Sequence, residues 1–149
     1  MAIADKAYST GQYEASFERD LKAYDGSDTG VKLWIKGLDC QASLDVSNKY
    51  KIDVTDLMLQ THAAKKDDES DHVLPKGERG RLFVEEMRDR YIACISRWDF
   101  GGQELFDGEG EPECDYETKA RFMAIPAFHE QVVKWVEEIS DFTKPSKKG

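Results

Sequence analysis

The spacing of apolar positions predicts the longest helix of the chain over about residues 78–98. Apolar side chains recur there every three or four residues, and charged side chains occupy the opposite face. The apolar stripe consists of Val84, Met87, Tyr91, Ile95 and Trp98, widened by Phe83 and Cys94. Gly101 and Gly102 follow, and glycine accepts the positive φ that commonly ends a helix. Because such a helix would span about 30 Å, we expect the other elements to pack on it.

Two shorter helices are predicted towards the C-terminus. Asp115 is placed to cap a helix over residues 116–124, and Glu117 suits the positive end of that helix's dipole. Pro126 ends this helix and fits the first turn of the next one. The apolar stripe of the last helix consists of Phe128, Val132, Trp135 or Val136, and Ile139.

The first half of the chain contains the strongest strand pattern. Residues 31–36 alternate, with Val31, Leu33 and Ile35 on one side. A single strand is unstable, so it needs a neighbour, and the candidates are the segment before Asp25 and residues 52–54. Residues 14–24 fit either a short helix or an irregular approach to a strand. Further helices are expected over residues 40–50 and 54–64.

Together these elements predict a mainly α fold with a small N-terminal β element, in the α+β class. The chain of 149 residues is long enough for one domain with a core. That single domain would run over residues 14–142, built on the long helix near 78–98 and two shorter C-terminal helices. It would have a β-containing half to about residue 64, a charged loop over 65–77 and a helical half over 78–142. Residues 1–13 are expected to form a flexible arm, and residues 143–149 a basic, disordered tail.

Charge and composition narrow the choice of partners. The net charge of -9 disfavours nucleic acid, because neutralising phosphates needs clustered Lys and Arg, and it suits a basic protein partner. No apolar run is long enough for a membrane span, and the N-terminus lacks the features of a signal peptide. The three widely spaced cysteines fit a reducing cytosol. We therefore expect a cytoplasmic protein that binds neither nucleic acid nor membrane.

The chain shows no pattern typical of a catalytic or metal site. Acidic residues at every second position from Asp107 suggest a calcium loop, which needs Gly at its sixth position and Glu at its twelfth. Pro112 and Thr118 occupy those positions. The histidines and cysteines are not spaced as zinc ligands, and no phosphate loop or nucleophile motif is present. We expect no catalytic residue, no cofactor and no metal, and conclude that the chain is not an enzyme.

Three aromatic residues, Trp98, Phe128 and Trp135, are the candidates for partner binding. Aromatic side chains at helical spacing usually belong to a core, whereas exposed aromatic patches mark binding sites. The core interpretation is strongest for Trp98. Trp135, near the end of the last helix, is the better candidate for an exposed contact.

The order of elements over residues 78–139 resembles that of a known family. The matching segments are Arg97-Trp98-Asp99, the turn over residues 107–112, residues 116–122 and Pro126-Ala127-Phe128. The strand over residues 31–35, followed by Gly37-Leu38, is similar to the family's N-terminal β segment. In this pattern the chain resembles the tail assembly chaperones of long-tailed bacteriophages. It departs from the tightest version of the pattern by a longer segment, residues 101–106, before the acidic turn.

The resemblance implies a chaperone that binds and solubilises the tape measure protein and helps recruit tail tube subunits during tail morphogenesis. Such a protein acts in the cytoplasm of the bacterial host and needs no cofactor, and self-association is left open. Two other functions remain as alternatives. The chain could be a structural tail or head–tail joining subunit retained in the virion, or an acidic inhibitor that mimics DNA, for which the acid run over residues 104–117 is the motivation.

Overall fold

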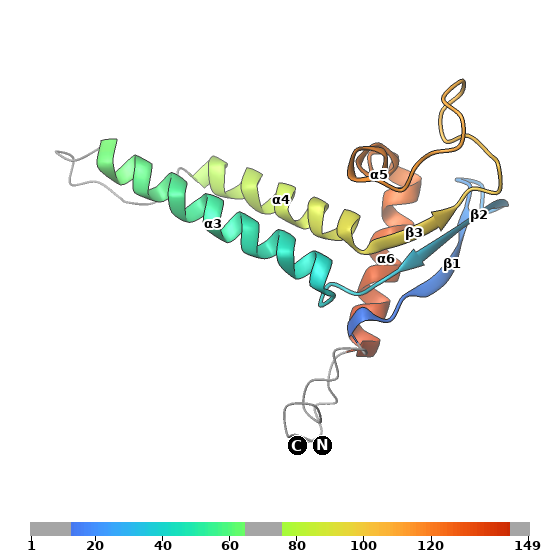
Figure 1. Ribbon diagram of the computed structural model, residues 1–149, viewed down its shortest axis with the longest axis horizontal. Coiled ribbons are helices and arrows are strands. Elements are labelled where there is room, and N and C mark those ends of the chain that lie inside the picture. Colours follow the sequence, from blue (N-terminus) through green and yellow to red (C-terminus); the bar gives the residue numbers. More distant parts are fainter. Residues whose placement is uncertain (1–12, 65–75, 144–149) are drawn as a thin grey trace, which may run out of the picture.

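A computed structural model describes residues 13–64 and 76–143. Its elements are β1 (Phe17–Lys22), β2 (Asp28–Ile35), α3 (Gln41–Ala64), α4 (Lys76–Ala93), β3 (Ile95–Asp99), α5 (Tyr116–Met123) and α6 (Pro126–Thr143). The three strands, α5 and α6 form a body, and α3 and α4 extend together from it as a two-helix arm (Figure 1). The flexible N-terminal arm, charged loop and basic tail expected from the sequence lie almost entirely outside the described residues.

The sheet is antiparallel, with the order β1-β2-β3. The strand expected over residues 31–36 is confirmed as the central strand β2. Its partner β1 lies before Asp25, which confirms the first of the two candidate segments. The other candidate, residues 52–54, is wrong because those residues belong to α3. The second neighbour of β2 is β3, which pairs Trp98 with Leu33. The sheet therefore joins strands from both halves of the chain.

The predicted plan of a mainly α domain built on a helix over residues 78–98 is wrong. Helix α4 ends at Ala93, and residues 95–99 form β3. The pairing of β2 with β3 shifts between Trp34 and Ile35, so that Ser96 is an extra residue in β3. Such a bulge turns Ile95 and Trp98, three positions apart, to the same buried face. The spacing that suggests one more helical turn is thus the spacing of a bulged strand.

The prediction of two separate helices over 40–50 and 54–64 is also wrong, since α3 is one helix of 24 residues. No Gly or Pro interrupts the sequence between Gln41 and Ala64, so the helix has no reason to stop near residue 50. The predicted C-terminal helices are confirmed. The Asp115 carboxylate accepts a hydrogen bond from the Thr118 N–H (2.8 Å) at the start of α5, and α6 begins at Pro126.

The core lies between the sheet and helices α5 and α6. Its centre is an aromatic cluster in which Phe122 of α5 contacts Trp98, Phe100 and Phe128, with ring centroids 5.0–6.5 Å apart. Buried aliphatic residues from β2 and α6 complete it: Val31, Leu33, Ile35, Val132, Val136 and Ile139. Of the two alternatives for the α6 stripe, Val136 is therefore the buried one. Ile92, near the end of α4, is also buried in this core, and the rest of the arm extends beyond it.

Candidate partner-binding surface

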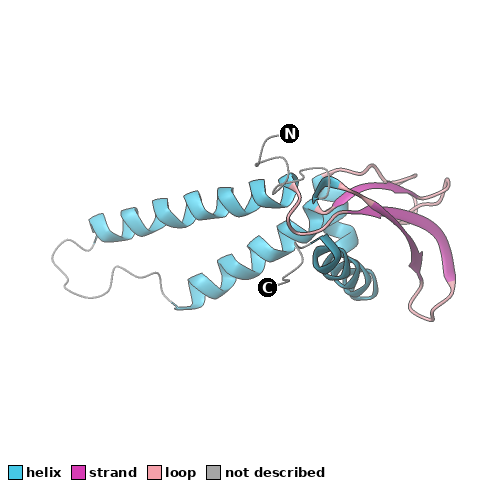
Figure 2. Cartoon of the chain, turned by 90° about the horizontal axis from the view of Figure 1, so that it is seen from below, coloured by secondary structure: helices cyan, strands magenta, loops and turns pink. Residues whose placement is uncertain are grey.

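The arm is held together by polar contacts. Helices α3 and α4 lie side by side and extend away from the sheet (Figures 1 and 2). The side-chain hydrogen bonds that join them are Ser47 Oγ to Glu86 (3.1 Å), Tyr50 Oη to Asp89 (2.7 Å) and Arg90 Nε to Ser43 Oγ (2.9 Å). Two helices held in this way leave their outer faces without a covering element in the described part of the chain.

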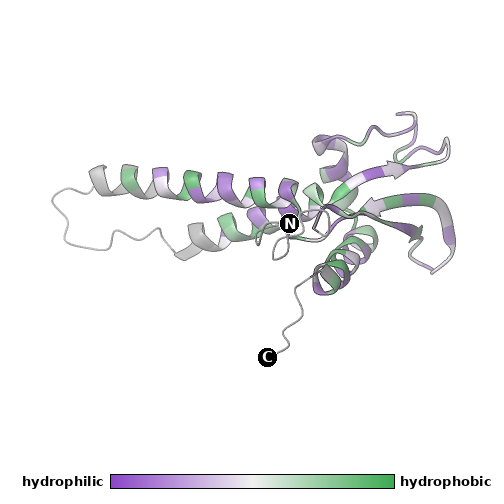
Figure 3. Ribbon diagram, turned by 60° about the horizontal axis from the view of Figure 1, so that its bottom comes forward, coloured by the Kyte–Doolittle hydropathy of each residue, from purple (hydrophilic) through white to green (hydrophobic). Residues whose placement is uncertain are grey.

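Those outer faces carry large apolar side chains. The exposed ones on the arm are Leu44, Ile52, Leu59, Phe83 and Val84. Ile52 and Leu59 are seven residues apart, which places them on one face of α3. Hydrophobic bands alternate with hydrophilic ones along this helix (Figure 3). Exposed apolar side chains gathered on one projecting element favour an interaction with another protein.

A groove of about 490 Å³ opens where the arm meets α5. Ala42 and Val46 of α3 and Ile92 and Ala93 of α4 form its apolar lining. Lys49 on α3 and Lys119 on α5 also line it. The groove therefore combines an apolar floor with two positively charged side chains.

A carboxylate bridged by two tyrosines forms the polar wall of this groove. Asp89 accepts hydrogen bonds from the hydroxyl groups of Tyr50 (2.7 Å) and Tyr116 (2.8 Å). Burial and this carboxylate raise the pKa of Tyr50, and the hydrogen bond to Asp89 raises the pKa of Tyr116. Both hydroxyl groups are therefore protonated at neutral pH and remain donors. The three residues connect α3, α4 and α5 at the groove.

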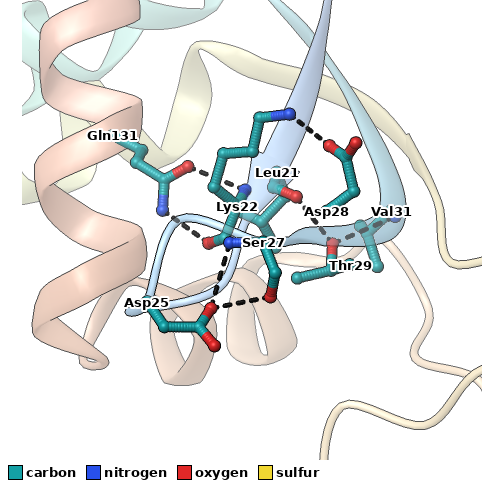
Figure 4. A network of polar contacts seen from close by, with 8 residues as sticks. All are labelled: Leu21, Lys22, Asp25, Ser27, Asp28, Thr29, Val31 and Gln131. Carbon is teal, nitrogen blue, oxygen red and sulfur yellow. Dashed lines mark hydrogen bonds and ion pairs between the residues drawn. The ribbon is translucent and has the colours of Figure 1, made fainter.

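A second groove, of about 660 Å³, lies between the β1–β2 turn and α6. Tyr24, which is 92% exposed, and the half-buried Trp135 border it. Figure 4 shows the hydrogen bonds between Gln131 of α6 and Lys22 of β1, which both line this groove. The Gln131 amide accepts from the Lys22 N–H (2.9 Å) and donates to the Lys22 carbonyl (2.8 Å). One side-chain amide thus satisfies both outward backbone groups of this edge-strand residue.

We expect replacement of Gln131 by leucine to lower the free energy of unfolding by about 1 kcal/mol, because two backbone groups lose their partner. Urea unfolding followed by circular dichroism measures this loss. Lys134→Leu, on the same helix and in the same groove, is the matched control and should change stability by less than about 0.5 kcal/mol. Equal effects of the two variants would contradict the structural role of the Gln131 amide.

The structure places the three aromatic candidates in different surroundings. Trp98 is 8% exposed, and its indole N–H donates to the Pro112 carbonyl (3.1 Å). Phe128 is half-buried and stacks on Phe122 with centroids 5.0 Å apart. The structure therefore joins Trp98 and Phe128 through the aromatic cluster and places Trp135 apart from them, beside the second groove. Trp135 and Phe128 are both half-buried, and Trp135 borders the larger of the two grooves that they line.

The apolar residues of the arm were missed by sequence reasoning. Phe83 and Val84 were assigned to a core stripe, but each is more than 60% exposed. Ile52 is one of the residues named above as a candidate second strand. The charged neighbours of Ile52, Lys51 and Asp53, are the signal that could have placed it on an exposed helix face.

The acidic segment before α5 is used within the fold. Glu109 forms a two-pronged ion pair with Arg121 (3.0 and 2.9 Å), and Glu111 accepts from the Gly102 N–H (3.3 Å). Over residues 13–64 and 76–143, no group of His, Cys, Asp and Glu side chains is arranged to hold a metal ion. In the same residues no helix is long and apolar enough to cross a membrane.

Two buried cysteines lie where the arm joins the body. Cys40 precedes α3 and Cys94 follows α4, and both are fully buried. The Cys94 thiol donates to the Gly37 carbonyl (3.4 Å). The neighbouring Cys40 and burial raise the pKa of Cys94, so its thiol stays protonated. Cys114, in contrast, is exposed.

Comparisons of this chain with protein-family models, curated proteins and solved structures found no match. A function for the chain therefore has to be argued from its own residues and geometry.

Proposed function

We propose that this chain is a tail assembly chaperone of a long-tailed bacteriophage, which binds and solubilises the tape measure protein and helps recruit tail tube subunits. It would act in the cytoplasm of the bacterial host, without catalysis, cofactor or metal. The observation that carries the proposal is the two-helix arm, whose exposed apolar residues Ile52, Leu59, Phe83 and Val84 face outward. The sequence pattern over residues 107–139, which resembles that family, adds support, whereas residues 97–99 belong to β3 and not to the end of a helix.

The arm suits a long helical partner for a physical reason. A tape measure protein exposes apolar stripes before the tail assembles around it, and such stripes aggregate. A projecting helix pair can lay its own apolar side chains against such a stripe. Reversible cover requires a modest affinity of each copy, and several copies along one partner add avidity. Tail tube subunits can then displace the chaperone as they polymerise.

Trp135 supplies a second contact in this proposal. It borders the groove between the β1–β2 turn and α6, together with the exposed Tyr24. Aromatic side chains at the edge of a groove are common anchors in protein interfaces. This surface is separate from the arm, so it can serve a tail tube subunit while the arm holds the tape measure protein. Trp98 and Phe128 support this face from within the core.

Co-expression with the long helical protein encoded nearest downstream in the source genome tests the proposal. The chaperone function predicts a soluble complex that dissociates when tail tube protein is added. The double variant Ile52→Ser, Phe83→Ser should leave the partner insoluble, whereas Phe142→Ser, which removes a still more exposed aromatic residue from the body, should not. An insoluble partner with the unaltered chain would reject the proposal. Detection of the chain in purified particles by mass spectrometry would favour the alternative, a structural tail or head–tail joining subunit.

A further inference from the structure

We propose that the groove between α3, α4 and α5 is a docking site for an acidic amphipathic helix. An apolar side chain of that helix enters the groove, and its carboxylates pair with Lys49 and Lys119. The inference rests on the proposed function, because it names the surface and the chemistry by which the chain would recognise its partner.

The shape of the groove fits a helix. Its walls come from two helices that lie side by side, and α5 closes one end. The α3 residues that line it, Ala42, Val46, Lys49 and Tyr50, follow helical spacing. A third helix laid along two neighbouring helices packs its side chains between theirs, as in a helix bundle. The half-buried Val46 and the exposed Ala42 are small enough to leave room for an incoming apolar side chain.

The charges of the groove select an acidic occupant. Asp89 already accepts hydrogen bonds from two tyrosine hydroxyls and from the Arg88 guanidinium (3.2 Å). Lys119 donates one hydrogen bond, to the Ile95 carbonyl (3.1 Å), and an ammonium group has three donors. Lys49 forms no hydrogen bond or ion pair with any described residue. The groove is therefore a local positive site on a chain of net charge -9.

The apolar floor distinguishes a helix from other anionic ligands. A phosphate or a nucleic acid would meet only two lysines and would leave the apolar side chains of Ala42 and Val46 uncovered. An amphipathic helix with acidic flanks can cover the apolar lining with its own apolar side chains and pair its carboxylates with the two ammonium groups, as in helix-in-groove recognition.

Binding of a designed probe tests the inference. The probe is a fluorescent helical peptide of about 18 residues, with leucines at i, i+3, i+4 and i+7 and glutamates beside them, and the comparison peptide has lysines in place of the glutamates. Fluorescence anisotropy measures both dissociation constants. We expect the acidic peptide to bind at least about tenfold more tightly than the basic one. Ala42→Trp, which fills the groove from an exposed position, should weaken binding of the acidic peptide by a similar factor.

A matched pair of charge reversals locates the contact. Lys49→Glu should weaken binding of the acidic peptide about tenfold. Lys51→Glu makes the same change on the same helix, at an exposed position outside the groove, and should leave binding within about twofold. Equal binding of the two peptides, or equal effects of the two reversals, would overturn the inference. Concentration-dependent dimers in light scattering that Lys49→Glu abolishes would assign the groove to a second copy of the chain and overturn it as well.

Failure of the proposed docking site can be distinguished from failure of the proposed chaperone function. If the unaltered chain and Lys49→Glu both keep the downstream helical protein soluble, the chaperone function stands and the docking site is elsewhere. If the acidic peptide binds as expected but the unaltered chain does not solubilise that protein, the groove stands and the chaperone function fails.

Discussion

Replacing Phe122 with alanine should lower the free energy of unfolding by about 3–5 kcal/mol. Phe122 is fully buried, and its ring lies 5.6 Å from Trp98 and 5.0 Å from Phe128, with which it stacks. These neighbours come from β3 and from the first turns of α6, so one side chain on α5 holds three elements together. Removing the ring loses its burial and leaves a cavity that rigid aromatic neighbours cannot close.

Urea unfolding followed by tryptophan fluorescence and circular dichroism measures this loss. The matched control is Phe83→Ala, because Phe83 is 62% exposed on the arm and its removal should cost less than about 0.5 kcal/mol. If Phe122→Ala does not fold, Phe122→Leu retains most of the volume and should lose about 1.5 kcal/mol. A Phe122→Leu variant as stable as the unaltered chain would show that the aromatic cluster does not organise the core.

The elements that sequence predicts well are those fixed by local chemistry. The alternation of Val31, Leu33 and Ile35 is repeated in the buried face of β2. Asp115 caps α5 through its own carboxylate, and Pro126 fits the first turn of α6. In each case the residue that predicts the element interacts with residues only a few positions away in the chain. Tertiary packing does not need to be known.

The boundary between α4 and β3 could not be predicted for the opposite reason. Ile95 and Trp98 continue the helical spacing of Met87 and Tyr91, and periodicity alone cannot distinguish a helix from a strand with a bulge. Pairing with β2 stabilises the strand conformation of residues 95–99, because β2 forms backbone hydrogen bonds with them. That strand lies about 60 residues earlier in the chain, so the competition between helix and strand is settled by a long-range contact.

The candidate site was only partly predictable. Trp98, Phe128 and Trp135 could be named from residue type, but their exposure depends on which elements cover them. Trp98 lies beneath the loop that leads to α5, where it donates to Pro112, while Trp135 remains at a groove edge. The exposure of the arm residues could not be predicted, because an apolar stripe predicts burial along its whole length. Phe83 and Val84 belong to the part of α4 that extends beyond the body.

Replacing Arg90 with methionine should lower the free energy of unfolding by about 2–3 kcal/mol and loosen the root of the arm. The Arg90 guanidinium donates from Nε to Ser43 Oγ (2.9 Å) and from Nη2 to the Leu38 carbonyl (3.0 Å). It thereby connects the end of α4 to the start of α3 and to the segment after β2. Ser43 is fully buried, so its hydroxyl cannot turn to water when the guanidinium is removed.

Hydrogen exchange measured element by element distinguishes this effect from general destabilisation. Exchange should accelerate in α3 and α4 and change little in β2 and α6, because the arm contributes nothing to the aromatic cluster. Lys at position 90 keeps the charge but lacks the fork that reaches two acceptors, so Arg90→Lys should restore only part of the loss. Arg81→Met, which removes a surface ion pair with Glu85 further out on α4, should cost less than about 0.5 kcal/mol.

Arg90→Met also tests whether the arm has a binding role that is distinct from the stability of the body. If the arm must be held at a fixed angle to present Ile52 and Phe83 to a partner, Arg90→Met should lose the soluble complex at temperatures where the body is still folded. Faster exchange in β2 and α6 to the same extent as in α3 would mean that arm and body unfold as one unit. In that case loss of the complex would follow from unfolding of the whole chain, and this result would contradict a separate binding role of the arm.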